Sequence, residues 1–423
     1  MWPRSSSGAW QPPSLARRRA RLTPDLPLRR YRVLDFCWQA AGPLVTEILA
    51  NLGAEVIRVE STTRIDQVRL YHHPLERFSI DTGAFFQDCN TGKKSISLDM
   101  SKAKARELVY RLVPHFDVVT DNFSPGQMEK WGLGYEQLRQ LRPDIIVASF
   151  PVMGSVGPHR HWRAVGNGVV ALCGLAGHTG FADRPPVGLG TVHTDFTLAP
   201  LAAASIMAAL LQREQTGQGQ RIEIAQYEAG IHLLDTELLE YLTDGQEAPR
   251  RGNRSPYLVP HGVFPCAGDD RWVAIAVRNV LEWQALCLLM GRPDLAARPD
   301  LQDVEGRRDH EDEIEAIVAA WTATQDAWQV TELLQSAGIP ASPVEHIGDL
   351  VDGEPAIQDF LVSFVHPTGV EFIVQNQPFT WHGQRLPVSR APLLGEHTEQ
   401  VLRHFLGLGE EEIQALVIEG VIA

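Results

Sequence analysis

The chain has 423 residues, of which 44% are hydrophobic and 21% charged, a composition typical of a globular protein with a sizeable core. Its formal net charge of −14 excludes the broad basic face that non-specific nucleic-acid binding requires. No apolar run of about 18 residues is uninterrupted, so we expect no membrane span. The five cysteines are widely spaced and lack a C-x-x-C pair, which favours a reducing, cytoplasmic setting over disulfides or structural zinc.

Residues 1–30 differ from the rest of the chain. They are rich in Arg, Ser and Pro, and their only acid is Asp25. A transit peptide has a similar composition, but the prolines disfavour the amphipathic helix that such a peptide forms. We therefore predict a disordered N-terminal tail, with folding signals that start at Tyr31.

The first folded segment predicts a βαβ unit with parallel strands: a strand at 32–36, a helix at 44–53 and a strand at 54–60. Such a unit suggests a dinucleotide site with Glu60 on the ribose. However, the first turn carries the single Gly42 instead of G-x-G-x-x-G. We therefore rank a nicotinamide or flavin cofactor low and interpret Glu60 as a strand-end charge.

Residues 61–86 are predicted to form a long loop, after which strands and helices alternate up to residue 150. The loop 122–126 follows one of these strands at its carboxyl end, where ligands bind in open α/β sheets. Lys93, Lys94 and Lys130 lie near loops and are candidates for binding phosphate groups.

The most informative stretch is 185–220. Asp195 stands directly before an apolar run that ends at Thr216-Gly217-Gln218-Gly219, which predicts a buried helix with an acid at its start. Two interpretations of Asp195 are compatible. It can cap the first helical turn, as Asp often does, or it can be a carboxylate nucleophile held ionised by the helix dipole.

The composition changes after Asp244, where a Pro-, Gly- and Arg-rich segment begins. A hairpin is predicted at 263–277, and helices follow it. We expect a smaller α+β domain at 245–350. Further strands are predicted at 360–381 and a final helix at 410–423.

Seven segments, in this order, resemble the class III coenzyme A transferase family, which contains formyl-CoA transferase, carnitine CoA-transferases and α-methylacyl-CoA racemase. The resemblance covers nearly the whole chain from Tyr31 onward. The segments are AGPLVTEILANLGAEVIRVE, NTGKKSISLDM, DNFSPGQMEKWGLGY, the Asp195 helix closing on TGQGQ, GNRSPYLVPHGVFPC, GIPASPV and APLLGEHTEQVL.

The resemblance implies an α/β fold with a Rossmann-like large domain built from both chain ends, at 31–244 and 351–423. A small domain at 245–350 is inserted between them. It also implies an interlocked, ring-like dimer, either a homodimer or a heteromer with a related subunit.

The resemblance further implies that Asp195 is the catalytic aspartate. The enzyme would move coenzyme A from an acyl-CoA donor, such as succinyl-CoA, to a carboxylic acid through an aspartyl-CoA thioester. Coenzyme A thioester is then a substrate, and neither a tightly bound cofactor nor a metal is expected. An aspartate with the ordinary pKa near 3.9 is ionised at neutral pH and needs no general base.

Loops that match the family motifs would contact coenzyme A, with Lys93 and Lys94 as additional phosphate candidates. Ordinary core packing is the alternative for Leu98 and Phe123. The implied contacts are Ala41, Leu98, Asn122, Phe123 and Lys130.

Two departures from the family pattern matter. The glycine run of formyl-CoA transferase is replaced by the segment 252–256, and Trp38-Gln39-Ala40 stands where that enzyme has His-x-Gln. Both disfavour formyl or oxalyl substrates. A 2-methylacyl-CoA racemase is an alternative, but Val165 occupies the position of its histidine. A second alternative is a non-catalytic subunit of a heteromeric transferase, and the presence of Asp195 argues against this alternative.

Overall fold

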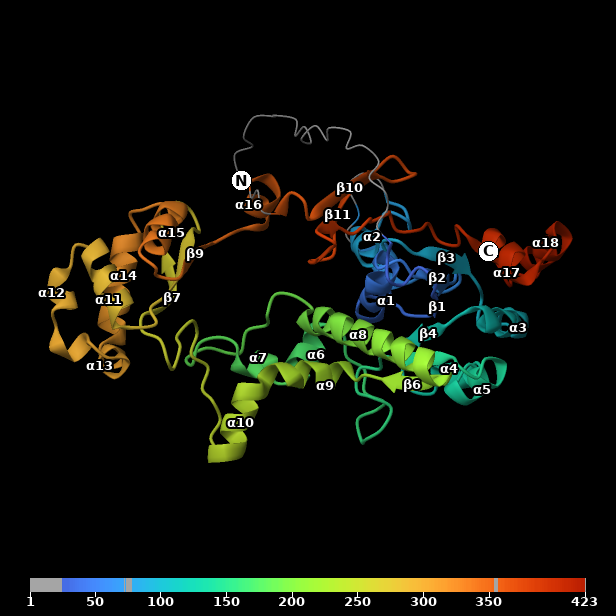
Figure 1. The fold of residues 1–423 in the computed structure, drawn as a ribbon, viewed down its shortest axis with the longest axis horizontal. Helices are drawn as coiled ribbons and strands as arrows, with labels where there is room; N and C mark the ends of the chain where they lie inside the picture. The colour runs from blue at the N-terminus through green and yellow to red at the C-terminus, as the bar shows by residue number, and fades with distance from the viewer. Residues whose placement is uncertain (1–24, 72, 74–77, 354–356, 423) are drawn as a thin grey trace.

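The computed structural model describes residues 25–71, 73, 78–353 and 357–422. At its centre is a six-stranded sheet whose neighbouring strands all run parallel, in the order β3-β2-β1-β4-β5-β6 (Figure 1). This is the strand order of a doubly wound, Rossmann-type sheet, so the predicted α/β fold with a parallel sheet is confirmed. The strands are β1 (Arg32–Asp35), β2 (Glu55–Glu60), β3 (Lys94–Ser97), β4 (Val118–Asp121), β5 (Ile146–Ser149) and β6 (Gln220–Glu223).

Alternate residues of each strand enter two different hydrophobic clusters, one on each face of the sheet. Val33 belongs to the cluster under α1 and α8, whereas its neighbour Leu34 belongs to the cluster under the helices of the other face. Because both faces are covered, neighbouring residues at the strand centres, such as Val56 and Ile57 of β2, are buried and apolar on both sides of the sheet. The covering helices are α1 (Ala41–Asn51) and α8 (His193–Thr216) on one face, and α3 (Ala103–Leu112), α5 (Tyr135–Leu141), α17 (Thr398–Leu406) and α18 (Glu410–Ile418) on the other.

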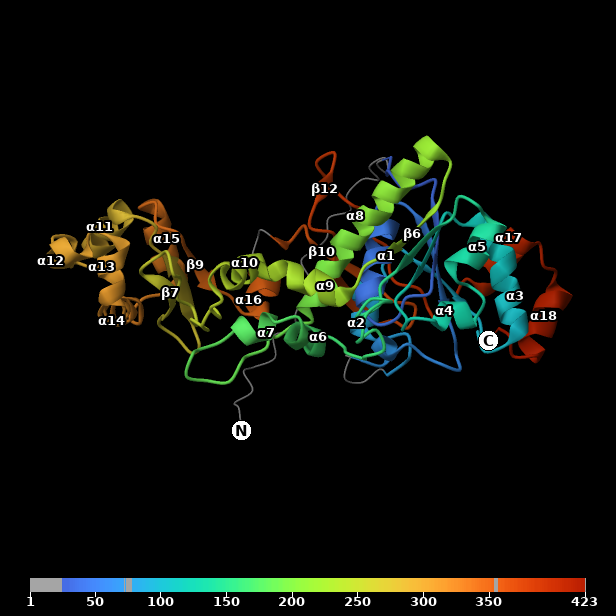
Figure 2. The ribbon, with the colours of Figure 1, turned by 90° about the horizontal axis from the view of Figure 1, so that it is seen from below.

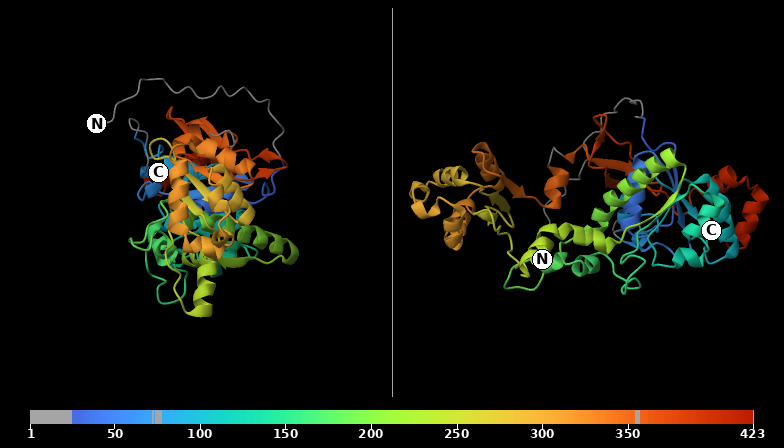
Figure 3. Two further views of the ribbon diagram at one scale, coloured as in Figure 1. Left: turned by 90° about the vertical axis from the view of Figure 1, so that its left-hand side faces the viewer. Right: turned by 60° about the horizontal axis from the view of Figure 1, so that its bottom comes forward.

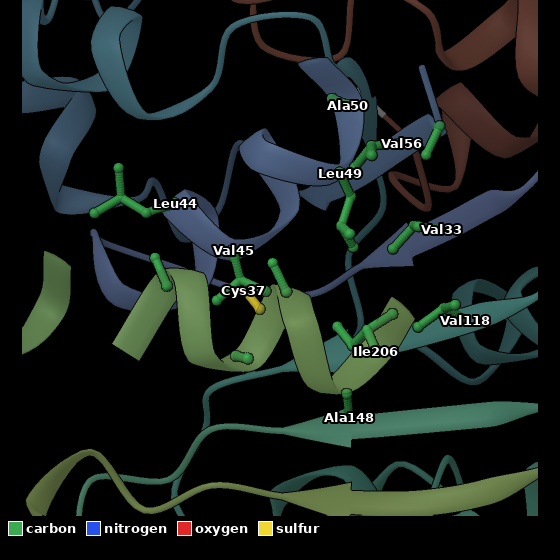
Figure 4. Close-up of a cluster of buried hydrophobic side chains, with 14 of the residues drawn as sticks. Val33, Cys37, Leu44, Val45, Leu49, Ala50, Val56, Val118, Ala148 and Ile206 are labelled. Carbon is green, nitrogen blue, oxygen red and sulfur yellow. The ribbon is translucent and has the colours of Figure 1, made fainter. Parts of the chain in front are cut away.

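Helix α8 packs along α1, and the close-up of this contact shows Val45 and Leu49 of α1 near Ile206 of α8 (Figure 4). The buried face of α8 is largely alanine, which lets the two helices approach closely. By length and composition α8 could cross a membrane, but half of its most apolar window is buried inside the protein, as in a core helix. It ends at Gly217, whose φ of 69° is left-handed.

A second body of structure lies at the far end of the molecule from the parallel sheet, and two stretches of chain connect the two (Figures 1 and 2). It contains an antiparallel sheet β7-β8-β9 and a separate hydrophobic cluster that runs from Val259 to Ala341. The predicted hairpin at 263–277 is present as β7 paired with β8. The elements are β7 (His261–Pro265), β8 (Trp272–Ala276), β9 (Ala341–Val344), α11 (Val280–Leu289), α12 (Pro293–Ala296), α13 (Val304–Asp309), α14 (Glu311–Thr322) and α15 (Ala327–Ser336).

The remaining elements connect these two bodies or border the parallel sheet (Figure 3). The predicted loop at 61–86 contains a short 3₁₀ turn at Gln67–Leu70 and the start of α2. The final predicted helix is present as α18. The connecting and bordering elements are α2 (Ala84–Cys89), α4 (Gln127–Lys130), α6 (Asn167–Leu172), α7 (Leu175–His178), α9 (Gln226–Ile231), α10 (Asp235–Asp244), α16 (Ile347–Asp352), β10 (Leu361–Val365), β11 (Glu371–Gln375), β12 (Thr380–Trp381) and β13 (Gln384–Arg385).

Residues 1–24 of the predicted N-terminal tail lie outside the described residues. The structure places Leu28 in the core, where it is 5% exposed and its N–H bonds the carbonyl of Leu52 at 3.1 Å. Packed structure therefore begins a few residues before Tyr31, because the Leu28 side chain belongs to the same hydrophobic cluster as the buried residues of α1.

Candidate active site

A cleft of about 660 Å³ lies at the carboxyl ends of β1 to β4. Strands β1 and β4 are neighbours in the sheet although they are not consecutive in the chain, so the strand order reverses between them. Parallel sheets bind ligands at such a switch point. Residues that follow each of the four strands line the cleft, including Trp38 after β1, Arg64 after β2, Leu98 after β3 and Phe123 after β4.

Three exposed cations line the cleft: Arg64, Lys130 and Arg163. None of them forms an ion pair of 4 Å or less with a described residue, in contrast to most of the arginines that the structure describes. Unpaired basic side chains around a cleft attract an anionic ligand, and the net charge of −14 makes their clustering here more notable. The cleft can therefore bind phosphate groups.

Aromatic rings form the wall of the cleft nearest to β1 and β4. Phe123 makes edge contacts with Trp38, at a ring-centroid distance of 5.9 Å, and with Trp131 at 5.3 Å. Edge-to-face contacts of this kind fix ring orientation in addition to burying apolar area. The wall offers a rigid apolar surface beside the three cations.

Asp195 lies in the first turn of α8 but is not the helix cap. The helix starts at His193, the cap position is Val192, and no side chain caps the turn. The interpretation of Asp195 as an N-cap is therefore wrong, because Asp195 lies inside the first helical turn and Val192 holds the cap position. Asp195 is 8% exposed, and its Oδ2 is buried without a hydrogen-bond partner among the described residues.

Burial raises the pKa of Asp195 to about 6, because removing water disfavours the charged form. Hydrogen bonding from the Gln226 side chain, from its own backbone and from the backbone of Ala41 lowers this pKa in part. No charged side chain is among the causes of the shift. The carboxyl is thus mostly ionised at neutral pH, yet poorly solvated, and such a carboxylate is more reactive than one in water.

The structure brings together most of the residues that the sequence predicted for the site. Leu98, Phe123 and Lys130 line the cleft, and Ala41 lies beside Asp195 as the first residue of α1. Leu98 is also part of the core, so its core interpretation is confirmed, whereas its contact with coenzyme A stays a prediction. Asn122 lies between β4 and the cleft, where its amide holds the backbone of Trp38.

Lys93 and Lys94 do not join this cluster. The ammonium of Lys93 is fully buried and bonds the Pro43 carbonyl at 2.7 Å and Asn90 at 2.9 Å. Lys94 begins β3 and pairs with Glu55, the first residue of β2, at 2.6 Å. Lys93 is thus enclosed in the core, and Lys94 is held at the amino end of β2, so neither lines the cleft.

Glu60 ends β2 and is paired inside the protein. Its two carboxylate oxygens accept from Arg69 at 2.9 and 2.7 Å, and Ser95 donates to it at 2.6 Å. Burial alone would raise its pKa, but the guanidiniums of Arg69 and Arg58 lower it to about 2. The interpretation of Glu60 as a strand-end charge is consistent with this ion pair.

Several residues of the site were missed by the sequence reasoning. Arg64 follows β2 at its carboxyl end, so the rule that placed 122–126 at the cleft could have found it. Gln226 and Arg163 had no comparable signal, since each reaches the site through long-range packing. No group of three or more His, Cys, Asp or Glu side chains suited to a metal ion occurs in the described part of the chain.

Comparison with known proteins now gives this geometry a context. Residues 28–398 match the family described as CoA-transferase family III. The chain is 32% identical to succinyl-CoA–D-citramalate CoA-transferase of Chloroflexus aurantiacus, covering 94% of this chain and 99% of that protein. It is 33% identical to formyl-CoA:oxalate CoA-transferase of Streptomyces avermitilis, covering 93% and 99%.

Among solved structures, a CAIB/BAIF family protein from Brucella suis superimposes with a TM-score of 0.81 at 29% identity. The match covers 90% of this chain and 99% of that one. A similarity of this extent means that the two chains share their arrangement of elements throughout, and not only the parallel sheet.

Proposed function

The chain belongs to CoA-transferase family III, and from this premise we propose that it moves coenzyme A from an acyl-CoA donor to a carboxylic acid, with Asp195 as the nucleophile. The observation that carries the proposal is the state of the Asp195 carboxyl. It is buried, it has an Oδ2 without a partner, and it lies beside the N–H of Ala41 at the start of α1.

The first half-reaction starts when a carboxylate oxygen of Asp195 attacks the carbonyl carbon of the donor thioester. The C–S bond breaks, coenzyme A leaves as the thiolate, and a mixed anhydride remains. The thiolate then attacks the Asp195 carbonyl carbon, which releases the donor acid as its carboxylate and leaves an aspartyl-CoA thioester. Covalent storage keeps the free energy of the thioester from being lost to hydrolysis.

In the second half-reaction the acceptor carboxylate attacks the aspartyl thioester and the same steps run in reverse. Each addition creates an oxyanion, which backbone N–H groups can stabilise. The Ala41 N–H is one of the donors to the Asp195 carboxyl and is a candidate for this role. The carboxyl is regenerated at the end, so no proton is consumed overall.

Coenzyme A would occupy the cleft at the carboxyl ends of β1 to β4. Its phosphates would face Lys130, Arg64 and Arg163, and its apolar parts would lie along Leu98 and the ring of Phe123. The turn that starts at Trp38 leads from this cleft to Ala41 and Asp195. A pantetheine arm that follows this turn would bring the thioester to the carboxyl.

We propose succinyl-CoA as the first donor to test, with small dicarboxylic acids as acceptors. Two relatives are named as succinyl-CoA transferases, that of Chloroflexus aurantiacus and a succinyl-CoA:mesaconate CoA-transferase of Haloarcula hispanica, 34% identical over 91% of this chain. Formyl-CoA and oxalate form the second pair to test, because other relatives are named for them.

A racemase of 2-methylacyl-CoA needs a base beside the α-carbon. In this chain the hydrogen bonds and charges that act on the Asp195 carboxyl involve no histidine. Val165, at the position of the racemase histidine, is 68% exposed. The residues around Asp195 therefore favour acyl transfer over proton transfer at carbon.

We also propose that the chain forms an interlocked dimer in which residues 245–350 act as an inserted small domain. The two connecting stretches leave the body at Val259–Ala341 apart from the parallel sheet (Figure 1). Helix α10 exposes Leu238, Leu239 and Leu242, an apolar face that a single chain leaves uncovered. Light scattering coupled to size-exclusion chromatography would give twice the chain mass of 46.9 kDa.

The function is tested by incubating the enzyme with each donor and acceptor acid and separating the CoA esters by chromatography. We expect a new acyl-CoA ester whose formation requires both substrates. As a control, the 2-methylacyl-CoA ester is incubated in deuterium oxide. Exchange at its α-carbon without acyl transfer would indicate the racemase, and hydrolysis alone would indicate a thioesterase. Neither reaction, in protein that still binds CoA, would indicate a non-catalytic subunit.

A further inference from the structure

The turn between β1 and α1 is held by side chains from three parts of the chain. Three successive backbone N–H groups, those of residues 37–39, each donate to a carboxylate or amide oxygen. The donors and acceptors are Cys37 to Asp35 Oδ1 at 2.9 Å, Trp38 to Asn122 Oδ1 at 2.8 Å, and Gln39 to Asp66 Oδ2 and Oδ1 at 3.0 and 3.2 Å.

Asn122 holds the turn at two points. Its Oδ1 accepts from the Trp38 N–H, and its Nδ2 donates to the Trp38 carbonyl at 2.8 Å. Asn122 directly follows β4, and Trp38 lies in the turn after β1. The Asn122 amide thus connects the chain after β4 to the chain after β1 at the switch point of the sheet. The packing here is tight: a Cβ added to Gly42 would lie 2.6 Å from Cys37 and 3.1 Å from the Asn122 Cγ.

Gln39 is in the left-handed region, with φ of 62°, although it is not glycine. This conformation costs free energy and persists only where the surroundings impose it. The Asp66 carboxylate provides the restraint, since both of its oxygens accept from the Gln39 N–H. Asp66 is itself buried and pairs with the fully buried guanidinium of Arg58, which also donates to Asn90 at 2.6 Å.

We propose that Asp66 and Asn122 are positioning residues, which hold the Trp38–Gln39 turn so that the Ala41 N–H faces the Asp195 carboxyl. The two residues touch neither Asp195 nor any reacting atom in this arrangement. They act through the backbone: Gln39 is fixed in a strained conformation, and α1 begins two residues later with Ala41. This proposal rests on the proposed function, because it takes Asp195 to be the nucleophile.

The proposal predicts a defect in the chemical step. A mispositioned Ala41 N–H no longer stabilises the ionised carboxyl or the oxyanion, and a lost hydrogen bond to a charged group costs about ten- to hundredfold. Asp66→Asn and Asn122→Ala should therefore lower kcat by about that factor. The Michaelis constant for the CoA thioester should change about twofold at most, because the cations of the cleft stay in place.

The second readout is the pKa of Asp195 itself, which requires no turnover. The infrared carboxyl band of Asp195 is obtained as the difference between the enzyme and Asp195→Asn and is titrated between pH 4 and 8. Weaker hydrogen bonding to the ionised form should raise the measured pKa of Asp195 by about 1 in both variants. The control is Asp81→Asn, which removes one carboxylate partner of Arg69 at a position that forms no hydrogen bond or ion pair with the described residues 38–41.

Two variants are used because Asp66→Asn leaves the buried Arg58 with one charged partner fewer and can lower stability. Asn122→Ala breaks no ion pair and adds no charge; it removes only the two hydrogen bonds to the Trp38 backbone. A raised pKa in both variants with Asp81→Asn unchanged supports the proposal. A wild-type pKa in folded Asn122→Ala and Asp66→Asn overturns it. If wild-type protein shows no transfer at all, the proposed function fails, whereas the titration still tests the positioning.

Discussion

The Asp195 carboxyl, in the first turn of α8, lies against the backbone N–H of Ala41, the first residue of α1. Two helix amino termini therefore meet at one carboxyl, and both helix dipoles favour its ionised form. Burial opposes them and is the larger influence, since the pKa is raised to about 6. The outcome is an anion that is available at neutral pH and has lost most of its water.

The pH dependence of the first half-reaction follows from this pKa. The nucleophile must be ionised, so the single-turnover rate of Asp195 acylation should rise about tenfold per pH unit below 6 and level off above 7. Rapid-quench measurement of the donor acid released in a single turnover, from pH 4.5 to 8.5, checks this. A rate that stays at its plateau down to pH 5 would mean that Asp195 has the ordinary pKa of an exposed aspartate.

Replacing the nucleophile should stabilise the protein. At pH 7.5 the folded state holds Asp195 ionised at a site that raises its pKa, which costs stability relative to the unfolded chain. Asp195→Asn removes this cost and should raise the free energy of unfolding by about 1–3 kcal/mol. The gain is full above pH 6 and shrinks toward pH 4, where Asp195 is protonated in the folded state.

Urea unfolding of wild type and Asp195→Asn at pH 7.5 and 5 measures this difference. Bound CoA is first removed from the wild-type protein by gel filtration, because a ligand would stabilise the folded state by mass action. Equal stability of the two proteins at pH 7.5 would contradict the raised pKa.

Lys130 should contribute to binding of the CoA thioester, and Lys104 should not. Lys130 lines the cleft. Lys104 on α3 does not line it, and its ammonium pairs with the Glu419 carboxylate at 2.5 Å. Lys130→Ala should raise the Michaelis constant for the donor about five- to tenfold with little effect on kcat, and more strongly at low salt. Lys104→Ala is the matched control. Equal constants for the two variants would place the phosphates elsewhere.

Lys93 should give a contrasting result, because its ammonium is enclosed in the core. Its ammonium bonds Asp35 at 3.5 Å and the Pro43 carbonyl at 2.7 Å inside the protein. Lys93→Met should lower the midpoint of thermal unfolding, and the remaining folded enzyme should bind CoA with an unchanged dissociation constant.

The ion pair between Arg69 and Glu60 is predicted to be important for folding. Both are buried, and Arg69→Met would leave Glu60 ionised with only Arg58 nearby. Breaking such a pair costs about 3–5 kcal/mol at pH 7. Because the pKa of Glu60 is lowered to about 2, its contribution is present above the ordinary value of 4.5 and is lost as the pH falls toward 2.

Chemical unfolding at pH 7 and pH 4 measures this effect. The loss should be smaller at pH 4, where Glu60 of the variant can accept a proton. The double variant Arg69→Met, Glu60→Leu should recover part of the stability, since no unpaired charge remains. A loss of less than about 1 kcal/mol in the single variant, as for an exposed pair, would contradict the account.

Local patterns predicted the parallel sheet and the helix at Asp195, because hydrophobic periodicity and the glycines after Thr216 determine them. They failed where neighbours in sequence separate in space. Lys93 and Lys94 differ by one residue, but the strand pleat turns one ammonium into the core and leaves the other at the sheet edge. Asp66 contacts Gln39 from 27 residues away, and no spacing rule connects them.

The resemblance supplied the role of Asp195, whereas its environment required the structure. From sequence the carboxyl was expected to be an ordinary, fully ionised aspartate. Burial depends on how α1 and α9 close over the start of α8, which is a property of packing.

The most direct test of the central claim is the covalent adduct on Asp195. Separate samples of the enzyme are mixed with succinyl-CoA or with one of the other donors. Each sample is quenched with hydroxylamine, digested and analysed by mass spectrometry. An aspartyl-CoA thioester would convert Asp195 to its hydroxamate, and we predict this change in wild-type enzyme only with a donor and never in Asp195→Ala. A hydroxamate on another residue, or transfer of CoA that persists in Asp195→Ala, would contradict the account.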